Sequence, residues 1–301
     1  MVTEERVREF GTPTLIDLFD SMPVEDFICE FELVEIGDDQ AWLPWELIHA
    51  TAPVGVKSIR NLDLVTLADG LKKFPDARVY AGYDVGRRHD NAELSGLITG
   101  TPASFARQGT MPDEAEPDQE EDQDIAEIAD RMVAREVYAR SFTRETFEGQ
   151  EAGLCALLQL PRTFLEIDET GMGIQMGERL VAKFGPSRVR PVNFGGKLDL
   201  PARRQIIEAP AKMAMAVVLK DAMQSGEIEF QVDRGKAYQM HSIRRKVTEA
   251  ANLILTVGKL DDDAGSREAG HHHADIFWAR ALATHCWKSK TSRPAFDFEV
   301  V

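Results

Sequence analysis

Three aspartates stand in settings where a carboxylate could do chemistry. Asp84 ends an apolar run at residues 78–85, Asp168 ends a second run at residues 162–168, and Asp275 opens an amphipathic stretch. Apolar runs rich in β-branched and aromatic residues predict buried strands. Carboxylates at the ends of two strands and at the start of a helix can converge on one point. Such oxygen ligands hold divalent ions, and a pair of these ions can hydrolyse a phosphodiester.

Each aspartate also has a purely structural interpretation. Asp84 lies between Gly82 and Gly86 and could cap a turn, while Asp275 sits in a first helical turn, where its charge suits the helix dipole. A charge buried at the end of a strand is costly unless something compensates it. This cost favours a cation-binding role for Asp84 and Asp168.

Four other residues are auxiliary candidates. Glu166 lies two residues before Asp168, on the same face of the predicted strand, where it could be a ligand or part of a salt bridge. Asp90 could be an accessory ligand or a turn residue. His272 and His273 could contact a phosphate, shuttle a proton or lie at the surface. Zinc binding by this histidine run lacks the further cysteine or histidine pair that would complete the site.

Other chemistries find little support in the sequence. The glycines at positions 171, 173 and 177 give G-x-G-x-x-x-G, which differs by one residue from the dinucleotide-binding fingerprint. A P-loop sequence is absent, which disfavours a P-loop ATPase. The three cysteines are far apart and share no C-x-x-C spacing, so neither a disulfide framework nor a zinc cluster is expected.

The net charge of −16 argues against nucleic-acid binding, because affinity for DNA normally comes from Lys and Arg. Much of the acid is local, in the run at residues 113–130. This run reads as a solvated loop, with a DNA-mimicking flap as the alternative. Hard carboxylate ligands favour Mg²⁺ or Mn²⁺, which would help such a site accept a polyanion. The candidate DNA-backbone contacts are Arg87, Arg88, Arg203, Arg204, Arg244, Arg245 and Lys246.

Strands and helices alternate from about residue 78. The expected strands are 78–85, 93–99, 131–142 (where a helix is possible), 162–168, 188–194 and 251–257. The expected helices are 144–160, 174–184, 201–225 and 274–287. Strands linked by helices, with an antiparallel hairpin near the front, predict an α/β domain of three layers.

The chain divides into an arm, a domain and a tail. Residues 1–75 are interpreted as a linker or docking arm, with a short helix at 19–32 and an aromatic-rich patch at 42–48. Residues 76–290 form the domain, with an acidic insertion at about 103–130, and residues 291–301 form the tail. Neither a membrane-spanning run nor a signal core is visible, which indicates a cytoplasmic protein.

The three aspartates stand in distinctive sequence contexts. Gly-Tyr-Asp-Val-Gly occupies residues 82–86, Ile-Asp-Glu-Thr-Gly-Met-Gly occupies 167–173, and His-His-Ala-Asp-Ile-Phe-Trp-Ala-Arg-Ala-Leu-Ala occupies 272–283. In this order they resemble the C-terminal nuclease domain of the large terminase subunits of tailed double-stranded-DNA phages, closest to the Mu-like branch. The resemblance covers roughly residues 20–288, including an arm similar to the segment that joins the family's packaging ATPase to its nuclease.

The resemblance implies a ribonuclease-H-like fold with a central mixed sheet flanked by helices. It also implies an endonuclease that cuts concatemeric viral DNA during genome packaging, in the cytoplasm of the infected bacterial host. Asp84 would bridge two Mg²⁺ or Mn²⁺ ions, and Asp168 and Asp275 would each help to hold one. The implied partners are double-stranded DNA, the packaging ATPase domain, the small terminase subunit and the portal protein. The ATPase itself is not in these 301 residues, and the acidic insertion has no counterpart in the family pattern.

Three alternatives remain open from the sequence. The same superfold could host a Holliday-junction resolvase, which four-way junctions would distinguish from a nuclease of linear duplex. A non-catalytic module that docks on the motor or the portal would show no carboxylate-dependent Mn²⁺ binding. A phosphotransferase of the actin-like type would bind a nucleotide, although a second phosphate loop is missing from the sequence.

Overall fold

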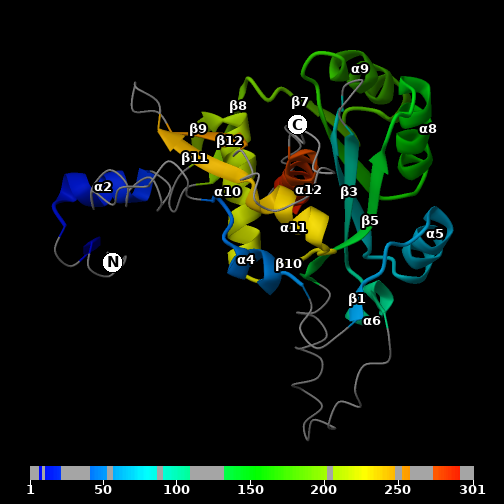
Figure 1. Cartoon of the computed structure of the whole chain (residues 1–301), viewed down its shortest axis with the longest axis horizontal. Helices are drawn as coiled ribbons and strands as arrows, with labels where there is room; N and C mark the ends of the chain where they lie inside the picture. The colour runs from blue at the N-terminus through cyan, green and yellow to red at the C-terminus, as the bar shows by residue number, and fades with distance from the viewer. Residues whose placement is uncertain are drawn as a thin grey trace, which may run out of the picture.

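The computed structural model describes residues 7–8, 11–21, 41–52, 57–86, 91–108, 132–201, 206–247, 253–257 and 274–291 (Figure 1). The predicted acidic run at 113–130 and the tail beyond residue 291 lie outside these ranges. So do most of the short helix expected at 19–32 and the residues that follow it up to 40. The helix that is described there, α2, spans Pro13–Ser21.

A six-stranded mixed sheet forms the centre of the molecule, in the order β10-β5-β3-β2-β6-β7. The strands are β2 (Arg78–Asp84), β3 (Ala92–Thr99), β5 (Ala134–Phe142), β6 (Thr163–Asp168), β7 (Val189–Val192) and β10 (Ile228–Glu229). β3 runs antiparallel to both β2 and β5, whereas β2, β6 and β7 are parallel. A mixed sheet in which β3 is the one antiparallel strand among parallel neighbours is typical of the ribonuclease-H-like fold. The predicted fold class is therefore confirmed.

Helices cover both faces of the sheet, which gives three layers (Figure 1). The first face carries α5 (Leu64–Lys73), α8 (Phe147–Leu158) and α9 (Gly173–Phe184). The opposite face carries α4 (Trp45–Ala50), α10 (Ala211–Gln224), α11 (Arg234–His241) and α12 (Asp275–Thr291). Side chains along β2 alternate between the two layers, as a strand's period of two requires: Val79, Ala81 and Tyr83 face the first cluster and Tyr80 faces the second.

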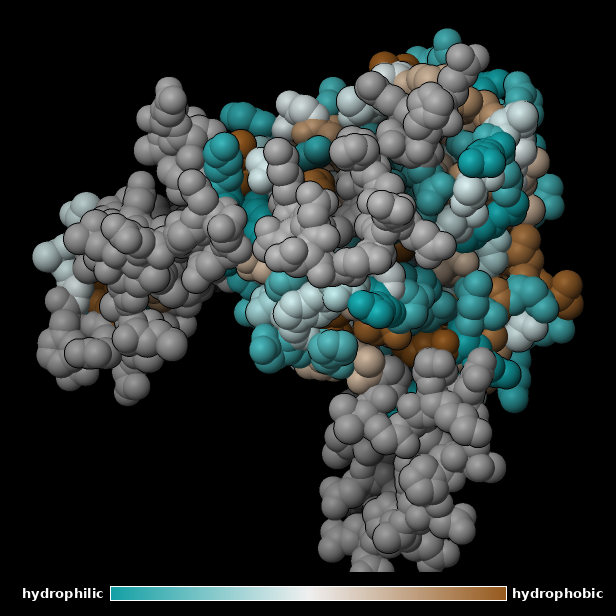
Figure 2. All heavy atoms as spheres, in the orientation of Figure 1, coloured by the Kyte–Doolittle hydropathy of each residue, from teal (hydrophilic) through white to brown (hydrophobic). Residues whose placement is uncertain are grey.

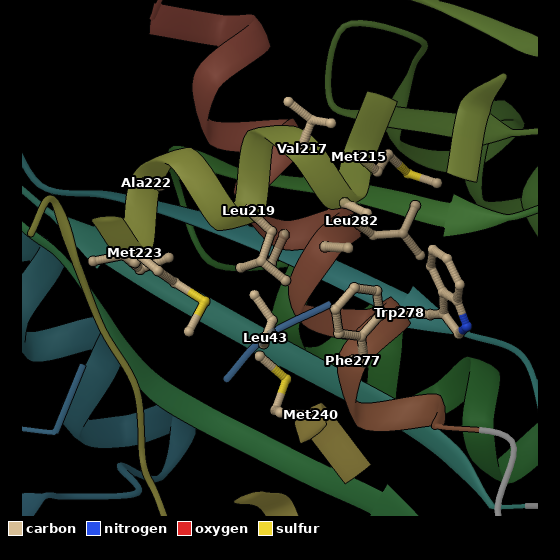
Figure 3. Packing of buried hydrophobic residues seen from close by; sticks show 14 of the residues in the cluster. Leu43, Met215, Val217, Leu219, Ala222, Met223, Met240, Phe277, Trp278 and Leu282 are labelled. Atoms are coloured by element: carbon tan, nitrogen blue, oxygen red, sulfur yellow. The ribbon is translucent and has the colours of Figure 1, made fainter. Parts of the chain in front are cut away.

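The helix predicted at 274–287 is confirmed as α12, but it is not amphipathic. It is buried on nearly every side, because it lies between the sheet and helices α10 and α11. Figure 3 shows Phe277, Trp278 and Leu282 of α12 packed against Leu219 of α10 and Met240 of α11. Side chains on several faces of α12 therefore fix its position, and with it the position of Asp275 at its first turn.

Two predictions about the second half of the chain are wrong. The helix expected at 201–225 begins only at Ala211, and the preceding residues form a hairpin of β8 (Lys197–Pro201) and β9 (Ile206–Pro210). Pro210, and not Pro201, precedes the first helical turn, while the β-branched pair Ile206 and Ile207 favours a strand. The strand expected at 251–257 exists as β12 (Leu253–Val257), but it pairs with β11 (Ile243–Val247) outside the central sheet.

The segment interpreted as an arm contributes directly to the core. Trp42 and Leu43 are buried against α10 and α11, and the Trp42 indole donates to the carbonyl of Ala216 at 3.2 Å. Helix α5 and strand β1 (Lys57–Ile59), which the sequence did not predict, pack under the other face. β1 pairs with β4 (Arg107–Gln108). In the chain, β4 directly follows the one-turn helix α6 (Ala103–Ala106).

The remaining predicted elements agree with the structure. The strands expected at 78–85, 93–99, 162–168 and 188–194 and the helices expected at 144–160 and 174–184 are present, and residues 134–142 form a strand. None of the described helices has the length and apolar character needed to cross a membrane. The coloured surface in Figure 2 is mostly hydrophilic, with smaller hydrophobic areas between.

Candidate active site

Asp84 and Asp168 end two neighbouring parallel strands at the same edge of the sheet. The register pairs Tyr83 with Ile167, so the two aspartates are the next residues along β2 and β6. Only 8% of Asp84 and 7% of Asp168 is exposed. Both lie on the face that α12 covers, because Gly82 and Tyr80, two and four residues before Asp84, contact that layer. The sheet therefore brings together two carboxylates that are 84 residues apart in the sequence.

Asp275 reaches the same place because α12 lies directly on β2. A Cβ atom added to Gly82 would be 2.1 Å from the carbonyl oxygen of Ala279 and 2.2 Å from the amide nitrogen of Ala283. Only glycine allows this approach. Asp275, one turn before Ala279, is 8% exposed. Ala274 precedes it in a left-handed conformation (φ 58°), a strain of about 1 kcal/mol that the packing of α12 must sustain.

The three carboxylates interact electrostatically. Burial raises the pKa of Asp84 well above its usual range, and the charges of Asp275 and Asp168 raise it further. Lys212 opposes this effect and lowers the pKa of Asp84. Desolvation and like charges both disfavour the ionised carboxylate. Among the described residues, burial and like charge thus outweigh the positive charge of Lys212 at Asp84.

The turn after β6 shapes the position of Asp168. One oxygen of Asp168 accepts hydrogen bonds from the Thr170 amide at 2.9 Å and from the Thr170 hydroxyl at 2.6 Å. Burial raises the pKa of Asp168, although the bonds from Thr170 and the charge of Lys212 oppose the shift. Gly171 adopts φ 64°, and a Cβ on Gly173 would lie 2.0 Å from the carbonyl oxygen of Asp168. These contacts explain the Asp-x-Thr-Gly-x-Gly sequence as a tight turn that leaves the second carboxylate oxygen available.

The donor set suits a hard divalent cation, since it consists of carboxylate oxygens without a thiolate. Among the residues that the structure describes, however, no group of three or more His, Cys, Asp and Glu side chains is arranged as a finished metal site. Asp84, Asp168 and Asp275 are thus neighbours that influence one another without forming a closed coordination shell.

Glu93 is a fourth buried carboxyl at this place, and the sequence analysis missed it. It pairs with Asp84 across β2 and β3, is 6% exposed, and accepts a hydrogen bond from the Ser141 hydroxyl at 2.8 Å. Burial raises the pKa of Glu93 to about 7, and Asp275 adds to the rise. A cavity of about 170 Å³ lies beside it and is also lined by Lys236. The signal that could have found it is a single charged residue in a strand that is otherwise uncharged.

The auxiliary candidate Glu166 has partners of its own. Its carboxylate accepts from Arg190 and lies 2.8 Å from Nδ1 of His285, near the far end of α12. These contacts favour the salt-bridge interpretation of Glu166. The other auxiliary candidates, Asp90, His272 and His273, lie outside the described residues, as do Arg87, Arg88, Arg203 and Arg204.

Of the residues predicted to contact the DNA backbone, the structure describes Arg244, Arg245 and Lys246, which lie on β11. The Arg245 guanidinium stacks over the Trp42 ring at 4.7 Å, and Arg244 donates to the carbonyl of His241. Lys246 is exposed. Arg244 and Arg245 therefore already have packing partners inside the chain, and Lys246 is the most available of the three.

No protein-family model matches the sequence, and no curated protein matches it. Several solved structures are similar. The large terminase nuclease from thermophilic phage G20c with bound magnesium is 15% identical, with 79% of this chain and 95% of that chain covered and a TM-score of 0.45. A mutant nuclease domain of the large terminase subunit of bacterial virus Sf6 with manganese and beta-thujaplicinol is 11% identical, with 82% of this chain and 99% of that chain covered and a TM-score of 0.48.

The large terminase of bacteriophage HK97 is 11% identical, with 81% of this chain and 43% of that chain covered and a TM-score of 0.42. The structures similar to this chain are thus large terminases or their nuclease domains, the family that the sequence motifs resemble.

Proposed function

We propose that the chain is a metal-dependent DNA endonuclease of the large-terminase type. The observation that supports this most is the burial of Asp84, Asp168 and Asp275 at one edge of a ribonuclease-H-like sheet. Burial, and then the charges of Asp275 and Asp168, raise the pKa of Asp84 there. A protein keeps such a costly cluster where it serves a function. We rest the proposal on these carboxylates and on their sequence contexts.

The three aspartates divide the work of holding cations. Asp84, whose pKa is raised by the charges of both other aspartates, would bridge two ions. Asp168 and Asp275 would each help to hold one. The hydrogen bonds from Thr170 engage one oxygen of Asp168, and its other oxygen would bind a cation. Bound Mg²⁺ or Mn²⁺ would lower the pKa of a water for attack on the phosphodiester and would stabilise the leaving oxygen.

The substrate would be double-stranded DNA, cut from concatemers during genome packaging in the cytoplasm of an infected bacterium. The chain would work with a packaging ATPase, a small terminase subunit and a portal protein. These finer assignments, like the Mu-like branch, rest on the resemblance of the three motifs.

The test is nicking of supercoiled plasmid in Mn²⁺ by the wild-type chain and by Asp84→Asn, Asp168→Asn and Asp275→Asn. We expect each substitution to lower the nicking rate by at least about 10²-fold, because each removes a charged ligand. Asp69→Asn is the matched control, since Asp69 is exposed on α5 and pairs only with Lys72 there. Full activity in any one variant would remove that aspartate from the site. Cleavage confined to four-way junctions would indicate a resolvase instead.

A further inference from the structure

We propose that Lys212 contacts the substrate in this site, with its ammonium group held over two aromatic rings so that it binds the DNA phosphate being cut. The inference rests on the proposed nuclease function and adds a cation from an element that carries none of the three aspartates. Lys212 is the second residue of α10, in the segment that follows the β8–β9 hairpin.

Two rings hold the side chain in place. The Nζ atom of Lys212 lies 4.8 Å from the centre of the Trp278 ring and 5.3 Å from the centre of the Phe194 ring. These rings are 5.5 Å apart at a tilt of 53°. An ammonium group at this distance from a ring face is attracted by the ring's quadrupole. The aromatic pair therefore limits where the charge of Lys212 can go.

The rings also tie Lys212 to the aspartates. Trp278 lies on α12, three residues after Asp275, and it is buried at 5% exposure in the cluster that fixes this helix (Figure 3). Phe194 follows β7, the strand next to β6 and its terminal Asp168. The positive charge of Lys212 acts on both Asp84 and Asp168. Lys212 thus stands at the same edge of the sheet as the carboxylates.

A direct ion pair with one of the aspartates does not account for the arrangement. Of the ion pairs between described residues, none includes Lys212, although the carboxylates are close enough to feel its charge. Its side chain is exposed, unlike that of Lys220 on the same helix, which is buried over Trp42. The ammonium group is therefore positioned by rings and remains accessible to an anion from solvent.

A phosphodiester gains negative charge as it is attacked, and a fixed positive charge beside it stabilises that transition state. Lysine provides a compact point charge for this purpose. Cations held by the aspartates would neutralise the carboxylates, which leaves the charge of Lys212 for the phosphate. Because Lys212 is itself positive, it should weaken the binding of cations slightly. A residue that only supported the aspartates would instead strengthen it.

The test compares Lys212→Met, which keeps the length of the stem, with Lys212→Arg, which keeps the charge. We expect Lys212→Met to lower the kcat of Mn²⁺-dependent plasmid nicking by about 10²-fold, as for the loss of one charge-stabilising donor. Lys212→Arg should retain most of the rate. The affinity for Mn²⁺ alone, measured by calorimetry, should be unchanged or higher in Lys212→Met, and its melting temperature should match wild type.

Lys197→Met is the control, because Lys197 is exposed on β8 and its ion pair with Glu208 lies in the hairpin. The inference is overturned if Lys212→Met nicks at the wild-type rate, or if its nicking and its Mn²⁺ affinity fall together. An inactive wild-type chain would overturn the nuclease function and this inference with it, whereas an active wild type with an active Lys212→Met overturns only the role of Lys212.

Discussion

Helix α12 carries two buried charges, five residues apart, in opposite situations. Asp275 and Asp168 add to the effect of burial in raising the pKa of Asp84, and Lys212 partly opposes them. Arg280 is 1% exposed and matched to Glu136: its Nε donates to one oxygen at 3.0 Å and its terminal nitrogen to the other at 2.5 Å. The same nitrogen also donates to the carbonyl of Gln231 at 2.7 Å. The middle of the helix therefore holds a matched ion pair, whereas its first turn adds a negative charge beside other buried carboxylates.

The pKa values show this difference. Burial acts to raise the pKa of Glu136, but the charge and hydrogen bonds of Arg280 outweigh it and leave the pKa below its usual value. For Asp84, burial and the neighbouring aspartates act in the same direction, and the pKa rises. The chain itself therefore compensates Glu136. Among the described residues, Lys212 opposes this rise, but burial and the two neighbouring aspartates outweigh it. A bound cation would add compensation of the kind that a site for metal ions and phosphate requires.

The largest effect on stability should come from breaking the complete pair. Glu136→Gln leaves the Arg280 guanidinium buried without its counter-charge, and we expect a loss of about 3–5 kcal/mol in the free energy of unfolding. Urea unfolding measures it. The double variant Glu136→Leu with Arg280→Met should recover much of the loss, since two apolar side chains replace two charges. A loss below about 1 kcal/mol in Glu136→Gln would mean that the buried pair contributes no more than an exposed one.

A smaller effect should appear in the pH dependence of stability. Glu93 and Glu136 line the same cavity, yet the pKa of Glu93 is raised to about 7 by burial. The unfolded carboxyl ionises near 4.5, so the folded form holds an extra proton between these values. The stabilisation is complete below pH 4.5 and is lost as the pH rises through 7. Asp84 and Asp168, whose pKa values are also raised, add to the same trend.

We therefore expect the metal-free chain to lose about 2 kcal/mol of unfolding free energy through Glu93 as the pH rises from 5 to 8. Glu93→Gln should flatten this part of the profile, measured by urea unfolding in the presence of a chelator. Glu208→Gln, at an exposed position on β9, is the control and should leave the profile unchanged. An identical slope in Glu93→Gln and wild type would contradict the assignment of the titration to Glu93.

The sequence predicted those site residues that stand out within a few neighbouring positions, and it missed those whose role depends on residues far away in the chain. Asp84 and Asp168 were found because a charge at the end of an apolar run is visible in a few residues, and Asp275 because it opens a helix. The order of the three motifs also carried the family resemblance that implied the fold class. Lys212 was missed because its setting comes from Trp278, 66 residues away, and Phe194, and no pattern near position 212 indicates it. The helix expected at 201–225 was wrong because two prolines offered equivalent start signals and only tertiary pairing of β8 with β9 distinguishes them.

The smallest expected effect on stability is a gain, in contrast to the loss expected for Glu136→Gln. It tests directly whether the aspartates differ from Glu136. Asp84→Asn removes one of several mutually repelling buried charges, so we expect the metal-free chain to gain about 1 kcal/mol in unfolding free energy at pH 8. The gain should shrink as the pH falls, because the raised pKa of Asp84 favours the protonated carboxyl in the wild type. The same substitution should abolish nicking, whereas Glu136→Gln should lose stability. A loss of stability in Asp84→Asn at pH 8 would show that the three aspartates, like Glu136, are already compensated within the chain, and the reason for expecting a cation there would disappear.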